Sequence, residues 1–267
     1  MLPTRAKYKQ ADLPIRPFLF LLVLAHFTIA ALSQAPDANP YFARKNTFSF
    51  LGAYSNDSSH IWLGVAESRK LVDIGAGYSR RLFVNRIVNW QYSFEILPVA
   101  LNSDPVLTTN TTETIVYNNG NTTQTITQVT QAPTGKSCDA PDDMTATFVY
   151  PTQTDTVVWK NTCSRRWVMG EAISPVGFQW NFMPRKKLQA IVVGHGGCMH
   201  SAQPIPTSDA GSFNFTFDIG AGFEMYRSKN RSIRAEYRYH HISNGGTAKE
   251  NPGIDNGVFQ VTYSVGR

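Results

Sequence analysis

The sequence has 267 residues, of which 42% are hydrophobic and only 16% are charged. About a quarter of the residues of a typical soluble protein are charged, so this chain is poor in charge. Its net charge of +6 falls to +3 when the N-terminal segment is set aside, because that segment holds four basic residues and one acidic residue (Arg5, Lys7, Lys9, Arg16 and Asp12). A charge of this size does not predict nucleic-acid binding, and it is compatible with an anionic membrane surface.

Residues 1–33 have the features of a secretory signal peptide. A basic stretch precedes the apolar run Phe18–Leu24, and Ala31-Leu32-Ser33 offers a small-x-small cleavage site before Gln34. The alternative is an uncleaved membrane anchor, but the apolar run is short for a span and is interrupted by His26. We therefore expect export from the cytoplasm and a single mature domain over residues 34–267.

The mature chain is dominated by short runs in which apolar and polar residues alternate, and this pattern predicts β-strands. Eight runs are found: Thr47–Ser55, Leu71–Arg80, Trp90–Val99, a segment within Val168–Trp180, Leu188–Gly197, Ser212–Met225, Ser232–Ser243 and Asp255–Val265. The links between them alternate strictly between long and short, which is typical of barrels with short periplasmic turns and long outer loops. The sequence thus predicts an all-β fold, an eight-stranded antiparallel up-and-down outer-membrane β-barrel with long extracellular loops.

The alternation within a strand indicates which face meets which environment. Over residues 212–225 the odd positions are apolar, from Phe213 to Met225, and most of the even positions are polar. In a membrane barrel the apolar face contacts lipid and the polar face fills the lumen. The alternative is a secreted soluble barrel or sandwich, in which the same alternation is inverted.

A long polar insertion, residues 102–166, separates the third and fourth predicted strands. It is rich in Thr and Asn and alternates β-branched with polar residues, so it is expected to extend a hairpin above the barrel. Cys138 and Cys163 flank a long polar segment and could close it as a disulfide, although the sequence does not decide the pairing. His195 and Cys198 fall on opposite faces of a strand, so we expect no metal site there, and no cofactor is indicated.

The end of the chain offers the three parts of a serine hydrolase. His241 and Ser243 are two residues apart, so they share one face of a strand. Asp255 begins the next strand, and a hairpin would bring the three residues together. The parity of the lipid-facing residues Ile233 to Tyr239 runs on into His241 and Ser243, which predicts a site on the outside of the barrel, at its upper rim. A lone His-x-Ser pair is common, so the alternative is an ordinary strand end.

At these residues the chain resembles the lipid A 3-O-deacylase family of outer-membrane barrels, the PagL type. The resemblance rests on His241-x-Ser243-Asn244, Asn251-x-Gly253-Ile254-Asp255, Phe217–Gly222 and Arg234-Ala235. It is specific from about Leu188 to the end, looser over the first three strands and absent in the insertion. Asp255 stands where the family pattern commonly has Glu.

The resemblance implies an esterase that removes an ester-linked acyl chain from lipid A in the bacterial outer membrane. Ser243 would be the nucleophile, His241 its base and Asp255 the carboxylate that orients the imidazole. Asn244, Asn251 and Gly245 are candidates to stabilise the oxyanion. The alternative is a non-catalytic structural or adhesive barrel. The acyl position that is cleaved and the formation of a homodimer stay open at this point.

Overall fold

The computed structural model describes residues 40–118 and 123–267, so the predicted signal peptide lies outside the described residues. The described part of the chain contains ten β-strands. They are β1 (Asn46–Ser55), β2 (Lys70–Val84), β3 (Val88–Tyr117), β4 (Thr123–Pro133), β5 (Met144–Val149), β6 (Gln153–Phe182), β7 (Leu188–Ser201), β8 (Phe213–Ser228), β9 (Arg231–Ser243) and β10 (Ile254–Gly266). No helix long and apolar enough to span a membrane occurs among the described residues.

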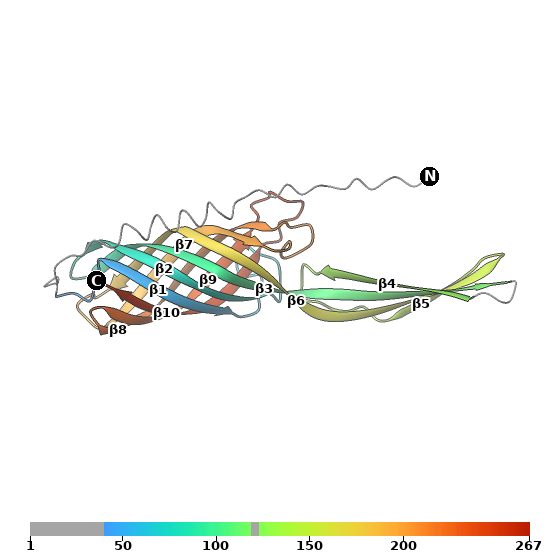
Figure 1. Ribbon diagram of the computed structural model, residues 1–267, viewed down its shortest axis with the longest axis horizontal. Coiled ribbons are helices and arrows are strands. Elements are labelled where there is room, and N and C mark those ends of the chain that lie inside the picture. Colours follow the sequence, from blue (N-terminus) through green and yellow to red (C-terminus); the bar gives the residue numbers. More distant parts are fainter. Residues whose placement is uncertain (1–39, 119–122) are drawn as a thin grey trace. The chain divides into compact units, whose positions relative to one another are not determined.

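Eight of the strands close into a ring (Figure 1). The sheet order is β4-β3-β2-β1-β10-β9-β8-β7-β6-β5, and an additional pairing of β3 with β6 completes the circle. The ladders between neighbouring strands are antiparallel. The predicted eight-stranded antiparallel barrel is therefore confirmed, and each predicted strand overlaps one strand of the ring.

The lumen is filled by paired charges. Arg238 donates from both terminal nitrogens to the Glu95 carboxylate, at 3.0 Å each, and it also lies 2.6 Å from Glu236 and 3.3 Å from Asp218. These side chains are buried, whereas large apolar side chains such as Phe223 point outward and are exposed. Buried charges need partners of this kind because desolvation is costly. The observed polar interior and apolar exterior are those predicted for a membrane barrel.

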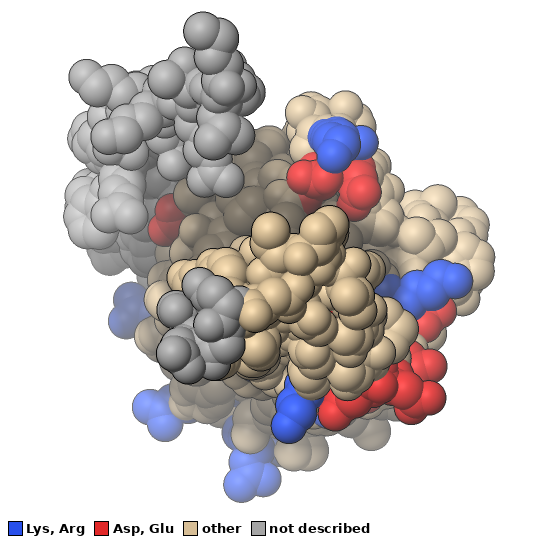
Figure 2. Space-filling model, turned by 90° about the vertical axis from the view of Figure 1, so that its right-hand side faces the viewer, with Lys and Arg blue, Asp and Glu red and all other residues tan. Residues whose placement is uncertain are grey.

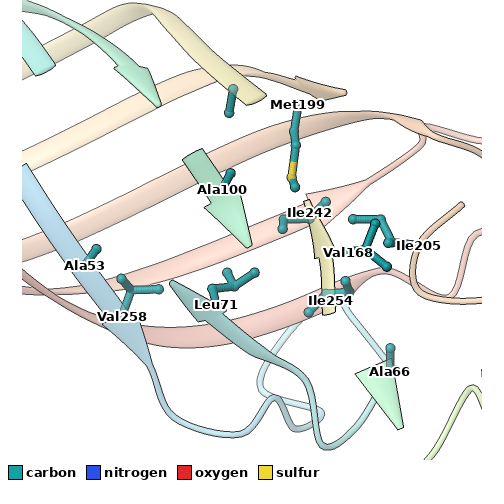
Figure 3. Close-up of a cluster of buried hydrophobic side chains, with 11 residues drawn as sticks. Ala53, Ala66, Leu71, Ala100, Val168, Met199, Ile205, Ile242, Ile254 and Val258 are labelled. Atoms are coloured by element: carbon teal, nitrogen blue, oxygen red, sulfur yellow. The ribbon is translucent and has the colours of Figure 1, made fainter. Parts of the chain in front are cut away.

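A cluster of buried apolar side chains lies at the end of the barrel where β9 ends and β10 begins (Figure 3). Ile242 and Ile254 face each other in the β9–β10 ladder, and each is at most 2% exposed. Burying an isoleucine side chain contributes on the order of 1.5–3 kcal/mol. The cluster therefore fixes the backbone on either side of these two residues, which includes the positions of His241, Ser243 and Asp255.

The insertion extends the same sheet beyond the ring as a four-stranded part, which we call the stem. β3 and β6 continue past the barrel as one ladder as far as Tyr117 and Gln153, and β4 and β5 pair onto their outer edges. The stem is thus a four-stranded sheet in the order β4-β3-β6-β5, with a Cys138–Cys163 disulfide. Much of the stem surface at the centre of Figure 2 carries no charged side chain. The expected hairpin extension is present, and the two flanking strands were not expected.

A buried arginine ties the stem to the barrel loops. Arg69 is fully buried, directly before β2, and its guanidinium lies 3.4 Å from the Asp104 carboxylate on β3. It also donates to the carbonyl oxygen of Gly135 at 3.0 Å and to that of Thr134. The Arg69 side chain therefore links the β1–β2 loop with β3 and with the residues that follow β4.

Candidate active site

The hairpin of β9 and β10 brings His241 and Asp255 together. They are directly opposite each other in the ladder, and His241 Nδ1 lies 2.6 Å from Asp255 Oδ1. A ring N–H on Nδ1 that donates to the carboxylate leaves Nε2 as the basic nitrogen of the imidazole. The His241 side chain is 12% exposed and that of Asp255 is fully buried, so only the histidine is accessible to a ligand.

Asp255 is held by the loop that joins β1 to β2. The backbone N–H groups of Trp62 and Leu63 donate to Asp255 Oδ2 at 2.7 and 2.8 Å. The Tyr239 hydroxyl donates to Asp255 Oδ1 at 2.8 Å. Hydrogen bonds to a carboxylate are among the stronger ones in proteins, and together with His241 they use both oxygens. The carboxylate is therefore fixed in one orientation toward the imidazole.

Gly64 permits this close approach of the loop. A Cβ atom at this position would lie 2.7 Å from the Asp255 backbone nitrogen and 2.8 Å from the Ile254 carbonyl carbon. The loop is also fastened to the β9–β10 connection, because Val65 N–H donates to Pro252 O at 2.7 Å and Ala66 N–H to Gly253 O at 3.0 Å. Any larger residue at position 64 would have to push the loop away from Asp255.

The same loop presents apolar side chains outward. Ile61, Trp62, Leu63 and Val65 are all exposed, and Trp62 most of all, at 66%. The sequence pattern predicts only a long link between strands over this segment. The four apolar residues, interrupted only by Gly64, in a predicted outer loop are the sequence signal that indicates this surface.

Three aromatic rings form a row beside the histidine. The Tyr239 ring centroid lies 6.0 Å from that of Trp62 and 6.4 Å from that of Phe217. Phe217 on β8 is the ladder partner of His241. The row, which we call the aromatic row (Trp62, Tyr239 and Phe217), therefore crosses from the β1–β2 loop over β9 to β8, next to the His241–Asp255 pair.

Ser243 follows His241 by two residues on β9 and pairs with Phe215 of β8. Its side chain is partly exposed. Among the hydrogen bonds of the described residues, none joins Ser243 to His241. The structure thus brings His241 and Asp255 into contact and places Ser243 on the same side of the same strand, without a direct bond.

The oxyanion candidates have different surroundings. The Asn244 side-chain amide donates to the carbonyl oxygens of Ala210 and Glu250, at 2.5 and 2.6 Å, and its Oδ1 accepts from the Gly246 N–H at 2.8 Å. Asn251 Oδ1 accepts from the Asn244 N–H at 3.0 Å. Asn244 is therefore engaged in holding the β9–β10 loop, while no hydrogen bond in the described structure uses the Asn251 Nδ2 group or the Gly245 N–H.

The lumen contains a second Ser–His–Asp arrangement, which sequence reasoning missed. Ser93 Oγ lies 2.8 Å from His195 Nε2, and His195 Nδ1 lies 3.1 Å from Asp218 Oδ1. The three residues come from β3, β7 and β8, and all are buried. A cavity lined in part by Asp218 and Arg238 has about 30 Å³, which is room for only a few water molecules. An acyl chain would not fit there.

Comparisons with known proteins give the following relationships. Residues 137–264 match the family model described as lipid A 3-O-deacylase (PagL). None of the curated proteins matches the chain.

Among solved structures, the crystal structure of the outer membrane enzyme PagL is 11% identical, with a TM-score of 0.45, covering 82% of this chain and 99% of that one. Neisserial surface protein A is 12% identical, with a TM-score of 0.38, covering 83% of this chain and 97% of that one. The outer membrane protein OprG from Pseudomonas aeruginosa is 9% identical, with a TM-score of 0.38, covering 85% of this chain and all of that one.

The family match begins just before Cys138, within the insertion, and includes every residue of the predicted triad. It covers the region over which the sequence resemblance is specific as far as residue 264, together with all of β5 and β6. The match therefore confirms the resemblance stated from the sequence, a PagL-type outer-membrane family.

Proposed function

We propose that this protein is an outer-membrane esterase that removes an ester-linked acyl chain from lipid A. The observation that carries the proposal is the His241–Asp255 pair, held by the β1–β2 loop beside Ser243 on the outer side of the barrel. The family match supports lipid A as the substrate. Ser243, His241 and Asp255 are the residues to which we assign catalysis.

In this proposal Ser243 Oγ attacks the ester carbonyl carbon while His241 Nε2 takes the hydroxyl proton. The tetrahedral adduct collapses, and the imidazolium returns the proton to the sugar oxygen as the ester C–O bond breaks. Water then hydrolyses the acyl-serine by the same sequence of proton transfers. Asp255 keeps the Nδ1–H tautomer and stabilises the imidazolium. The Ser243 oxygen would have to approach Nε2 when substrate binds, since catalytic hydrogen bonds often tighten only with substrate bound.

The tetrahedral oxyanion needs hydrogen-bond donors that are not already used. We assign this role to the Gly245 N–H and to the side-chain amide of Asn251. Asn244 supports them, because its amide organises the loop from which both project. Removing one such donor typically raises the barrier by about 2.7–4 kcal/mol.

The acyl chain would lie along the aromatic row. Trp62, Tyr239 and Phe217 offer contiguous apolar surface next to His241, on the side of the barrel where exposed apolar residues meet lipid. Polar groups on a lipid-facing surface are costly and need partners or a function. Here Asp255 is covered by the loop, and only His241 and Ser243 are left to meet a lipid ester.

The test is mass spectrometry of lipid A from cells that express the wild type, Ser243→Ala or Ser93→Ala. The proposal predicts that an acyl chain is lost with the wild type and with Ser93→Ala, and retained with Ser243→Ala. Identical lipid A profiles in all three strains, with all three proteins folded in the outer membrane, would favour the non-catalytic structural or adhesive barrel.

A further inference from the structure

The stem has one long open edge. β4 pairs with β3 on one side, and no described strand pairs with its other side. It is 11 residues long, its side chains are exposed from Thr123 to Ala132, and it contains no charged residue. Proteins usually blunt such an edge with charged residues, an internal proline, a bulge or a short strand. β4 carries none of these within Thr123–Ala132, because its one proline, Pro133, is its last residue.

The opposite edge of the stem differs. β5 is only six residues long, and two acidic residues, Asp142 and Asp143, precede it. The Asp143 carboxylate accepts a hydrogen bond from the Asn161 N–H at 3.1 Å. A short strand flanked by charge is a protected edge, so the two edges of one sheet are not equivalent.

The β4 sequence is a palindrome about its fourth residue. Gln124-Thr125-Ile126-Thr127-Gln128 is the same in both directions, and the residues that flank it, Thr123 and Val129, are both β-branched and of similar shape. Two copies of this segment that run antiparallel about Ile126 would place each residue opposite its own kind. A twofold interface requires this kind of self-complementarity.

We propose that β4 pairs antiparallel with β4 of a second copy of this chain, with the twofold axis at Ile126. Thr125 then faces Thr127 of the partner, Gln124 faces Gln128, and the two stems form one continuous sheet. Cross-strand threonine pairs and pairs of β-branched residues stabilise a ladder. The absence of charge means that no like charges are brought together. The proposal does not depend on the proposed esterase activity.

The pairing fixes the relative orientation of the two chains. Pro133 pairs with Val106 near the barrel, and Thr123 pairs with Val116 at the far end of the stem, so β4 runs toward its own barrel. Antiparallel pairing therefore puts the two barrels at opposite ends of the joined sheet. Two such chains embedded in membranes would lie in membranes that face each other.

Disulfide trapping in the full-length protein tests the register. The background is Cys198→Ser, because Cys198 is the free cysteine of the described chain. Residues opposite each other in an antiparallel ladder have Cα atoms about 4.5 or 5.5 Å apart, which a disulfide can bridge. Ile126→Cys should therefore give a covalent dimer by itself. Gln124→Cys and Gln128→Cys should each stay monomeric, because their identical residues would be about 13 Å apart. A mixture of these two variants should cross-link.

Equal cross-linking by Gln124→Cys alone, or no dimer with Ile126→Cys, would overturn the proposed register.

Clustering of liposomes that carry the protein tests the facing orientation. Ile126→Lys places two like charges together and should abolish clustering, while Thr147→Lys on β5 should leave it unchanged. Heat-modifiable mobility shows that each variant still forms its barrel. Failure of wild-type liposomes to cluster would overturn the proposed pairing between membranes, whatever the result for lipid A.

Discussion

Two sites in this molecule contain the same three residue types in different surroundings. Ser93, His195 and Asp218 lie inside the barrel, are hydrogen-bonded in series and are surrounded by Arg238 and Glu95. Ser243, His241 and Asp255 lie at the outer side of β9 and β10. The inner set has the more complete hydrogen bonding, whereas His241 and Ser243 of the outer set are partly exposed and can be reached by a substrate. Judged by hydrogen bonds alone, the inner set would be taken for the active site.

The difference lies in what each histidine can do next. His195 is buried among charged partners, so a substrate cannot reach it to exchange a proton. Its hydrogen bonds instead satisfy buried polar groups. His241 has one nitrogen fixed by Asp255, its side chain is partly exposed, and no hydrogen bond among the described residues uses its other nitrogen. Variants of the two sets should therefore differ in activity and in stability.

The serine variants should differ most. Ser243→Ala removes the nucleophile and should lower the deacylation rate by about 10³-fold or more, since removal of a catalytic serine has cost as much as about 10⁶-fold elsewhere. Ser93→Ala should change the rate less than about threefold. Time courses of acyl release from purified lipid A in mixed micelles measure both. A comparable loss with Ser93→Ala would contradict the assignment.

The two aspartates should show opposite effects. Asp255→Asn should favour the wrong imidazole tautomer and reduce the rate by roughly 10⁴-fold, while it lowers stability by about 1 kcal/mol. Asp218→Asn should leave Arg238 and His195 with less compensation and destabilise the barrel by up to about 3–5 kcal/mol. Urea unfolding in lipid vesicles, together with the rate of the protein that remains folded, separates the two. The reverse pattern would place the chemistry in the lumen.

Gly64→Ala tests the loop that holds Asp255. The added methyl group must displace backbone, because a Cβ would lie within 2.8 Å of the Asp255 nitrogen and the Ile254 carbon. The loop should move, the two N–H bonds to Asp255 should weaken, and the rate should fall by about 10–100-fold, equivalent to roughly 1.4–2.7 kcal/mol. Gly52→Ala is the matched control, since no atom lies within 4 Å of its Cβ position. Equal rates for the two variants would show that the loop is not needed.

Trp62→Ala should have the smallest effect. It removes one ring of the aromatic row, where a ring pair contributes about 0.5–1.5 kcal/mol, so KM should rise by roughly 2–10-fold with little change in kcat. Trp167→Ala, at another exposed tryptophan, is the control. A fall in kcat at unchanged KM would mean that Trp62 acts on Asp255 rather than on the acyl chain.

The strands of the ring could be predicted because period-two alternation and the alternation of loop lengths both point to a barrel. Residues 212–225 are an example, since each odd residue from Phe213 to Met225 faces outward in β8. The contact of His241 with Asp255 followed from the same reasoning, because a hairpin joins neighbouring strands. Both inferences needed only the alternation of residues and the order of strands and links along the chain.

The features that the sequence did not predict depend on contacts between segments that lie far apart along the chain. Nothing in the sequence near Asp255 shows that the N–H groups of Trp62 and Leu63, some 190 residues away, meet its carboxylate. The loop supplies those bonds to a residue that is shorter than the glutamate of the family pattern. The luminal set was equally hidden, because its three members come from three different strands. The β-branched residues near Thr123 predicted extended structure, but not that they would form a separate edge strand.

Covalent labelling with an alkyl fluorophosphonate, which reacts with activated serines, tests directly whether Ser243 is the nucleophile. The protein in detergent micelles is labelled, digested and mapped by mass spectrometry. We expect an adduct on Ser243 that disappears in His241→Ala, with Ser93 unmodified in both. An adduct on Ser93, or an unmodified Ser243 in folded protein that deacylates lipid A, would contradict it.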